Sequence, residues 1–406
     1  MQKANLITAL DIGTSSIKGV CLLKNGKSNS LELAASAQHP SFGVRRGVVV
    51  RVEEVSKIIN NILEQLENQS GQKIESVFVN IGGSHIFTMN SSGSVVVSRA
   101  DQRISQEDVD RVVQAAQTFS LPFNKEILDI YPKEFTVDGE KGIKGSPLGM
   151  QGLKLEAQVL AIGAFSPYFK NSTSAVLNSG LQILDIIPSP VATARAVLSP
   201  QQKELGTCVI DIGAGTTDVA IYKEGDLMGA AVLPIGSDHI THDIAVWLKT
   251  DIEAAERIKI EFGTCDQSSS KKEKIKVSGE DNNLVFSRKM LSGIIVARIT
   301  DIFSEVQKEI KNNFQGEILP GGIVLTGGGS KLPKIVELCK KELKLPCRLG
   351  FQQYVREAEK DSSLSCAYGL ALWGFDSQDG LDRSDLTTFG KEVWNRSKNF
   401  FRNFIP

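Results

Sequence analysis

The stretch Thr207–Lys223, TCVIDIGAGTTDVAIYK, carries the strongest fold signal of this chain. Apolar, β-branched runs stand on both sides of a glycine-containing turn, which predicts a β-hairpin. Glycines let backbone N–H groups approach an anion closely, and hydroxyls add donors. Asp211 ends the incoming strand and could hold Mg²⁺ through water. The candidate phosphate-binding residues of this turn are Gly213, Gly215, Thr216 and Thr217.

The same phrase occurs near the N-terminus, where Leu6–Leu23 reads LITALDIGTSSIKGVCLL. Its candidate residues are Asp11 for the metal, and Gly13, Thr14, Ser15 and Lys18 for the phosphates. A third glycine turn, TGGGS, follows the apolar run Gly322–Leu325, and its residues Gly327, Gly328 and Gly329 suit the flat face of a nucleoside. Two phosphate hairpins two hundred residues apart predict two similar domains that face each other across a cleft.

Length, charge and cysteine content fit an ordinary globular protein. The 406 residues are enough for roughly two or three domains. The formal net charge of −1 gives no electrostatic reason to expect nucleic acid as a partner. The six cysteines include no CxxC pair, and neither a signal peptide nor an apolar run long enough to span a bilayer is evident. We therefore expect a reducing, cytoplasmic compartment.

The segment 84–158 differs from its surroundings and predicts a small inserted α/β subdomain. It contains a helix at Gln106–Ala116, with Ser105 as the expected cap. Two strand-like runs follow at 126–131 and 133–137, and then a loop at 139–152. The strand Leu155–Phe165 is expected to return to the first domain.

The C-terminal residues form two segments of different character. Residues 376–388 are polar and acidic without a hydrophobic period, which predicts a flexible tether. Residues 389–406, TFGKEVWNRSKNFFRNFIP from Thr388 onward, predict an amphipathic helix whose apolar side chains fall within an arc of roughly 160°. Aromatic residues opposite basic ones are typical of a helix that lies in a membrane surface. The apolar face comprises Phe389, Val393, Trp394, Phe400, Phe401, Phe404 and Ile405, and the basic residues are Lys391, Arg396, Lys398 and Arg402.

These motifs together resemble the actin, sugar kinase and DnaK-type chaperone superfamily. The DIGTSS and DIGAGTTD hairpins, the TGGGS turn and the AAERIKIEFG helix carry the resemblance in the expected order. The inserted block with ISQEDVDRVVQAA, the run PIGSDHITHDIA and the tail make the chain similar to the FtsA family of bacterial cell-division proteins. The resemblance covers nearly the whole chain and implies an α/β, actin-like ATPase fold with two duplicated domains around a nucleotide cleft.

The resemblance also implies how the chain is divided. The first domain (1A) would comprise residues 1–83, 159–190 and 351–375, with the insert (1C) at 84–158. The second domain (2A) would comprise residues 191–235 and 302–350, and its outer subdomain (2B) residues 236–301. The cofactors would be ATP and Mg²⁺, with Glu256 and Lys259 at the ribose and adenine.

The partners that the resemblance implies are all components of cell division. FtsZ would bind through its C-terminal peptide on the outer subdomain, where Arg288, Lys289 and Arg298 could form a basic groove; from sequence alone, a solvated helix face is an equal alternative. The protein would polymerise with itself, contact other division proteins, and attach peripherally to an anionic membrane at the cytoplasmic face of the division site.

One departure concerns catalysis. Relatives in the superfamily carry a Glu-Pro pair at the domain crossing, whereas this chain reads Pro188-Ser189-Pro190. A hydroxyl is a poor general base, so we assign no catalytic residue and expect ATP hydrolysis to be slow at most. Two alternatives stay open: a PilM-like component of type IV pilus assembly, and a small-molecule kinase, for which we find no substrate motif.

Overall fold

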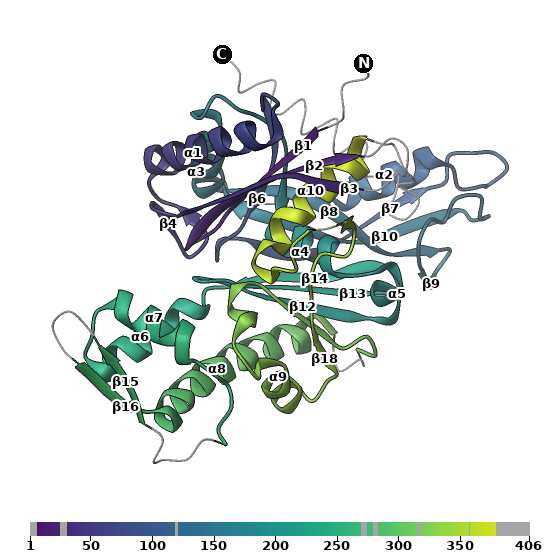
Figure 1. The fold of residues 1–406 in the computed structure, drawn as a ribbon. Coiled ribbons are helices and arrows are strands. Elements are labelled where there is room, and N and C mark those ends of the chain that lie inside the picture. The colour runs from purple at the N-terminus through teal and green to yellow at the C-terminus, as the bar shows by residue number, and fades with distance from the viewer. Residues whose placement is uncertain are drawn as a thin grey trace.

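The computed structural model describes residues 6–24, 31–117, 121–268, 274–278, 283–314, 319–356 and 358–378. Figure 1 shows two α/β domains stacked one above the other, with the insert beside them. The predicted membrane helix at 389–406, and the tether from residue 379 onward, lie outside the described residues. Within the described residues, no helix is both long and apolar enough to span a bilayer.

The first domain is a six-stranded sheet covered by helices on both faces. Strands β1 and β2 form the predicted hairpin, and β6 runs parallel to β1 on its other side. Side chains alternate along β1, so Ile7 and Ala9 join one core while Leu10 and Ile12 join the other. The strand order is β11 (Gln182–Pro188), β6 (Ser76–Ile81), β1 (Leu6–Ile12), β2 (Ser16–Lys24), β3 (Leu31–Pro40) and β19 (Val355–Arg356).

Helices α1, α3 and α10 enclose this sheet. The predicted helical spacing at 52–66 becomes α1 (Val52–Ser70), which ends at Gly71 in the left-handed conformation that glycine favours. Helix α3 (Ser166–Leu177) lies on the same side, and α10 (Ser365–Gln378) on the other. A small hairpin, β4 (Val44–Arg45) and β5 (Val48–Val49), leads into α1.

The second domain repeats the plan of the first with five strands. Strands β12 and β13 are the second predicted hairpin, and β17 is parallel to β12. The order is β14 (Asp226–Leu233), β13 (Thr217–Lys223), β12 (Thr207–Ile212), β17 (Ile323–Thr326) and β18 (Cys347–Leu349). Helices α8 (Arg288–Phe314) and α9 (Ile335–Leu343) cover one face, while α4 (Ser189–Val197), followed by the short α5 (Pro200–Leu205), lies between the two domains.

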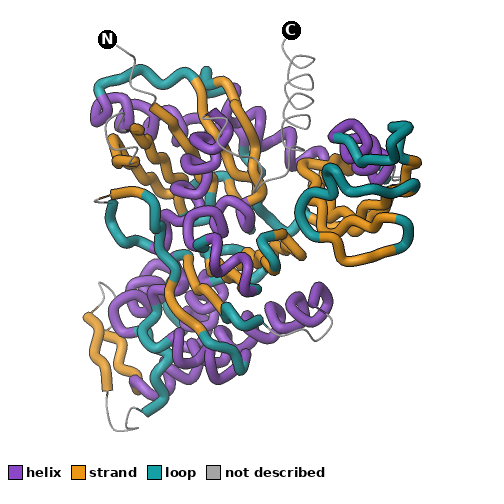
Figure 2. Tube along the Cα trace, turned by 90° about the vertical axis from the view of Figure 1, so that its right-hand side faces the viewer, coloured by secondary structure: helices purple, strands orange, loops and turns teal. Residues whose placement is uncertain are grey.

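An outer subdomain extends the second domain. It contains α6 (Ser237–Leu248), α7 (Ile252–Phe262) and the antiparallel pair β15 (Lys274–Ser278) and β16 (Asn283–Ser287). This strand pair stands at the far end of the second domain in both views (Figures 1 and 2). Asp251 caps α7 as its side chain accepts the backbone N–H of Ala254 at 2.7 Å.

The insert is a four-stranded antiparallel sheet with α2 (Gln106–Ala116) packed on it. Ser105 caps α2 in a reciprocal capping box with Asp108. The strand order is β7 (Phe87–Val96), β10 (Lys154–Phe165), β8 (Lys125–Val137) and β9 (Glu140–Ile143).

Three expectations for the insert were wrong. The runs 126–131 and 133–137 form the single strand β8: Pro132 pairs with Val159, and the register shift between Gln158 and Val159 leaves Lys133 as the extra residue of a bulge. The predicted loop contains β9. The strand at 155–165 does not return to the first domain; it is β10, which pairs on both edges within the insert. The predicted boundary after residue 158 therefore cuts through a strand.

The predicted tether also begins too early. Helix α10 continues to Gln378, and Asp376 accepts two hydrogen bonds from the Arg195 guanidinium, at 2.6 and 2.9 Å. Asp376, predicted to be part of a solvated acidic segment, instead joins α10 to Arg195 of α4.

Candidate nucleotide-binding cleft

The turns of the two hairpins meet at the cleft between the domains. The backbone N–H of Gly47, in the β4–β5 turn, donates to Thr14 Oγ1 at 2.9 Å. A Cβ placed on Gly215 would lie only 2.8 Å from Thr14 Oγ1 and 3.0 Å from the Cα of Arg46. Glycine is therefore required at 215 for the close approach of the first domain to the second.

Two adjoining cavities, which share lining residues such as Ser15 and Lys18, occupy the cleft. The inner one, of about 80 Å³, lies between the hairpin turns, and the outer one, of about 410 Å³, lies between the second hairpin, α6, α7 and the third glycine turn. Predicted residues that line the inner cavity are Asp11, Gly13, Thr14, Ser15, Lys18, Asp211, Gly213, Thr216, Gly327 and Gly328. Predicted residues that line the outer cavity are Ser15, Lys18, Gly213, Glu256, Lys259, Gly328 and Gly329.

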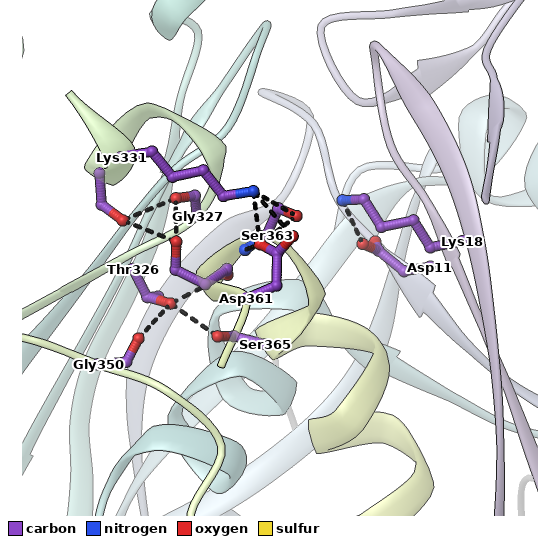
Figure 3. A network of polar contacts seen from close by, with 11 residues as sticks. Asp11, Lys18, Thr326, Gly327, Lys331, Gly350, Asp361, Ser363 and Ser365 are labelled. Atoms are coloured by element: carbon purple, nitrogen blue, oxygen red, sulfur yellow. Dashed lines mark hydrogen bonds and ion pairs between the residues drawn. The ribbon is translucent and has the colours of Figure 1, made fainter. Parts of the chain in front are cut away.

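Three carboxylates surround the inner cavity, and one cation faces them. Lys18 Nζ lies 3.4 Å from Asp11 Oδ2 (Figure 3). Burial lowers the pKa of Lys18, but the charges of Asp11 and Asp211 outweigh it and raise the pKa above its usual value. Lys18 therefore carries a positive charge that could also meet a phosphate.

Burial disfavours the charged forms of Asp211 and Asp218, the two carboxylates of the second hairpin. Burial raises the pKa of Asp211, opposed by the 2.9 Å hydrogen bond that Thr193 donates to its Oδ2 and reinforced by the charge of Asp11. Burial and the neighbouring charges of Asp211 and Asp11 raise the pKa of Asp218 well above its usual range. Asp218 Oδ1 is buried and has no hydrogen-bond partner within the described part of the chain. Such a set of carboxylates favours a bound cation.

The donor set fits a hydrated Mg²⁺ better than a directly ligated metal. Among the described residues, no group of three or more His, Cys, Asp or Glu side chains is arranged to hold a metal ion directly. Asp11 and Asp211 nevertheless line the same small cavity. Since Mg²⁺ keeps several waters when it binds with phosphates, two carboxylates at the edge of a phosphate pocket suffice for it.

Asn80 organises the first hairpin and was missed in the sequence analysis. Its side-chain oxygen accepts the backbone N–H of Ile12 at 2.7 Å, and its amide donates to Asp11 at 3.0 Å and to Ser189 at 3.1 Å. The signal was present, since Asn80 is a polar residue within the apolar run 74–81. Ser189 in turn donates to the carbonyl of Ile81 at 3.1 Å. The hydroxyl at the domain crossing is thus engaged in structure.

The predicted ribose and adenine residues lie together at the outer cavity. Lys259 Nζ lies 2.7 Å from Glu256 Oε2, and it also donates to Thr241 Oγ1 at 2.8 Å and to the Ser237 carbonyl at 3.3 Å. The hydroxyl of Thr241 donates to Glu256. Lys259 is buried while Glu256 is partly exposed, so the carboxylate faces the cavity from a fixed position.

Three residues that were predicted to contact a ligand have other roles in the structure. Thr217 lines neither cavity, because its hydroxyl donates to the Ile235 carbonyl at 2.7 Å; it offers no donor to a phosphate. Gly215 also lines neither cavity, and its role is the close approach described above. Arg298 makes a bidentate ion pair with Asp243 at 2.7 and 2.9 Å, so its charge is already matched.

Two duplicated α/β domains with paired hairpins around a cleft define an actin-like fold. Solved structures agree: the PilM–PilN type IV pilus biogenesis complex matches with a TM-score of 0.64 at 18% identity, over 91% of this chain and 98% of that one. MreB5 of Spiroplasma citri bound to AMPPNP matches with a TM-score of 0.54 at 14% identity, over 93% and 98%. At these identities the likeness shows the fold alone.

Closer relatives establish the family. The family model described as cell division protein FtsA matches residues 208–369, and the model of the SHS2 domain inserted in FtsA matches residues 83–162. The cell division protein FtsA of Pseudomonas aeruginosa is 35% identical over 95% of this chain and 93% of its own length. That of Bacillus subtilis is 33% identical over 87% and 80%. The chain belongs to the FtsA family of cell division proteins. Its likeness to PilM, the alternative considered from sequence, is a likeness of fold.

Proposed function

We propose that the protein is an ATP-binding actin homologue that polymerises and tethers FtsZ filaments to the cytoplasmic face of the cell membrane at the division site. The observation that carries the ATP part is the convergence of both hairpin turns, Lys18 and three carboxylates on one cavity, with Glu256 and Lys259 at the adjoining one. The family supplies the setting of cell division.

The nucleotide phosphates would occupy the inner cavity. The N–H groups of Gly13 and Gly213 donate to the carbonyls of Ser16 and Thr216 within the turns. The backbone N–H groups that follow them in the turns, the hydroxyls of Thr14 and Thr216, and the Lys18 ammonium would donate to phosphate oxygens. Asp11 and Asp211 would hold Mg²⁺ through its waters, and the ion would offset the charge of the phosphates and the carboxylates together. The outer cavity, with Glu256 and Lys259, would accept the nucleoside.

Hydrolysis would be slow because the expected base is absent. Ser189 stands where relatives in the superfamily carry a carboxylate, and its hydroxyl is already committed between Asn80 and the Ile81 carbonyl. A hydroxyl so held does not take a proton from water at neutral pH. ATP would therefore act chiefly as a ligand that closes the two domains on each other.

For FtsZ, the outer subdomain offers a surface of mixed character. Lys289 and Met290 are exposed at the start of α8, and Val285 is exposed on the preceding strand. An acidic and apolar peptide, such as we infer for the FtsZ C-terminus, would match this combination. Because Arg298 is paired with Asp243, the proposed contact rests on Lys289 and the two apolar side chains.

Attachment to the membrane would come from residues 389–406, and it would be modest for one molecule. Basic residues add about 1 kcal/mol each near an anionic surface, and forming so short a helix costs part of the gain. Several tails on one polymer would hold far better through their effective concentration. Anchoring and self-assembly are therefore coupled in this proposal.

The proposal is tested by co-sedimentation with anionic lipid vesicles. The full chain, a truncation after Gln378, and the full chain with Phe400→Asp and Phe401→Asp are compared with and without Mg-ATP, with FtsZ filaments added in a second series. We expect only the unaltered chain to pellet with vesicles, more so with Mg-ATP, and to bring FtsZ with it. Equal pelleting of all three forms contradicts the role of the tail, and failure of the vesicle-bound chain to recruit FtsZ contradicts the tether.

A further inference from the structure

Two helices, α4 and α10, both begin at the cleft and lead away from it. Ser189, the first residue of α4, lines the inner cavity. So do Ser363, just before α10, and Cys366 in its first turn. The described part of the chain ends with α10 at Gln378, and residues 379–406 follow.

The start of α10 is bonded to the glycine turn at the cleft. The backbone N–H of Gly327 donates to the Ser362 carbonyl at 3.1 Å, and the Ser362 hydroxyl returns a hydrogen bond to the Gly327 carbonyl at 2.9 Å. The hydroxyls of Thr326 and Ser365 lie 2.7 Å apart (Figure 3). Several hydrogen bonds therefore join this turn to the start of α10.

Helix α4 contacts both the cleft and α10, through Thr193 and Arg195. Thr193 donates to Asp211 in the cleft at 2.9 Å. Two residues further on, the Arg195 guanidinium binds both carboxylate oxygens of Asp376, in the last turn of α10, at 2.6 and 2.9 Å. The guanidinium also lies over the ring of Tyr354, 4.8 Å from its centroid, which fixes its orientation.

The backbones of the two helices touch beside these contacts. A Cβ placed on Gly369 of α10 would fall within 1.7 Å of the Ala192 carbonyl oxygen of α4, so the backbones touch. In Figure 1, α10 crosses α4 at the centre of the molecule. Because the backbones touch at the crossing and Arg195 joins the helices beyond it, a shift of one helix would press on the other.

We propose that α4 and α10 form a lever that couples occupancy of the cleft to the last turn of α10, the root of the C-terminal segment, with the Arg195–Asp376 ion pair as its latch. The inference rests on the proposed nucleotide site. Nucleotide and Mg²⁺ would act on Asp211 and on the turn at Gly327, and the latch would carry the change to residues 373–378. The position of the last turn of α10 would thereby differ between the empty and the occupied protein.

Hydrogen–deuterium exchange of a peptide covering the last turns of α10 tests the lever in the full chain, with and without Mg-ATP. Asp376→Asn opens the latch, and Arg195→Lys keeps the charge but loses the bidentate geometry. Asp243→Asn is the matched control, since Asp243 and Arg298 form a bidentate pair of nearly equal geometry and exposure between α6 and α8. Nucleotide affinity is measured for each variant by calorimetry.

We expect Mg-ATP to slow exchange at the last turns of α10 by about fivefold or more in the unaltered chain and in Asp243→Asn, as for an ordinary coupling between sites. In Asp376→Asn and Arg195→Lys the slowing should be largely lost, while nucleotide affinity stays within a few-fold. Unchanged slowing in the latch variants, or no slowing in a chain that binds Mg-ATP, overturns the lever. Absence of nucleotide binding in the unaltered chain overturns the proposed function instead.

Discussion

Asp211 and Asp218 lie directly opposite each other in the β12–β13 ladder, so two carboxylates share one face of the hairpin. Thr193 donates a hydrogen bond to one oxygen of Asp211, whereas Oδ1 of Asp218 has no hydrogen-bond partner among the described residues. The buried Asp218 carboxylate lowers the folding stability of the empty protein, and a cation bound in the cleft would offset this loss.

The stability of the empty protein should therefore depend on Asp218 in a pH-dependent way. Burial and two neighbouring carboxylates raise the pKa of Asp218 in the folded state, so the folded chain holds a proton that the unfolded chain releases above about pH 4. Stability from this group is present at low pH and is lost as the pH rises. Asp218→Asn removes the ionisation, and its advantage over the unaltered chain should grow by roughly 1–3 kcal/mol between pH 5 and pH 7.

Thermal unfolding of both chains without Mg²⁺ or nucleotide measures this difference. Glu107→Ala, an exposed residue of α2, serves as the control whose effect should not change with pH. If the two chains differed by the same amount at both pH values, Asp218 would not be the titrating group.

Asn80→Ala should weaken both the fold and the site. The change removes the acceptor of the buried Ile12 N–H and a donor to Asp11, which costs about 1–3 kcal/mol of unfolding free energy. Because Asp11 loses its orientation, the affinity for Mg-ATP should fall by about tenfold, an energy similar to that of one such hydrogen bond. Urea unfolding and calorimetry measure the two effects. Asn90→Ala, at an exposed position of the insert, should change neither; full Mg-ATP affinity in Asn80→Ala would refute its role.

Lys259→Ala should lower nucleotide affinity by about tenfold. The buried ammonium holds Glu256, Thr241 and the start of α6 in one arrangement at the outer cavity. Lys308 and Glu305 form an ion pair of the same i, i+3 spacing on the outside of α8, so Lys308→Ala is the matched control. Binding of a fluorescent ATP analogue distinguishes them, and equal losses in the two variants would show a general effect of helix charge.

Asp108→Ala should unfold the insert more readily. Its buried carboxylate accepts from the backbone N–H groups of Ser98 and Ser105 and pairs with Arg111. Leaving those donors without a partner costs about 2 kcal/mol or more, whereas Glu107→Ala on the same helix should stay within about 0.5 kcal/mol. Hydrogen exchange of α2 reports the difference. Slow exchange in Asp108→Ala, equal to that of the unaltered chain, would disprove this role.

Local patterns predicted the hairpins, most helices and the residues of the cleft, because glycine turns and apolar periods act over short distances. The contacts of Asn80 with Asp11 and of Thr193 with Asp211 could not be derived from sequence, since each depends on how two separate elements pack together. The assignment of β10 failed for a similar reason. An apolar strand at residues 155–165 could belong to the sheet of the first domain or to that of the insert. Its pairing with β7 and β8 assigns it to the insert.

Thr217 and Arg298 are residues that the sequence predicted to bind a ligand but that the fold already engages. Their residue types fit the proposed chemistry, but the Ile235 carbonyl and the Asp243 carboxylate already engage them. The sequence shows which side chains have groups that could bind a ligand. It does not show which of these groups already bond to other parts of the protein.

Calorimetric titration of the full chain with ATP in the presence of Mg²⁺ measures whether a phosphate site lies between the two hairpins, with Lys18→Ala and Thr217→Ser as paired variants. We predict saturable binding at one site per chain, at least tenfold weaker in Lys18→Ala because a charged donor to phosphate is lost. Binding should be unchanged in Thr217→Ser, which keeps the hydroxyl that bonds to Ile235. No saturable binding by the unaltered chain, or equal binding by Lys18→Ala, would contradict a phosphate site between the two hairpins.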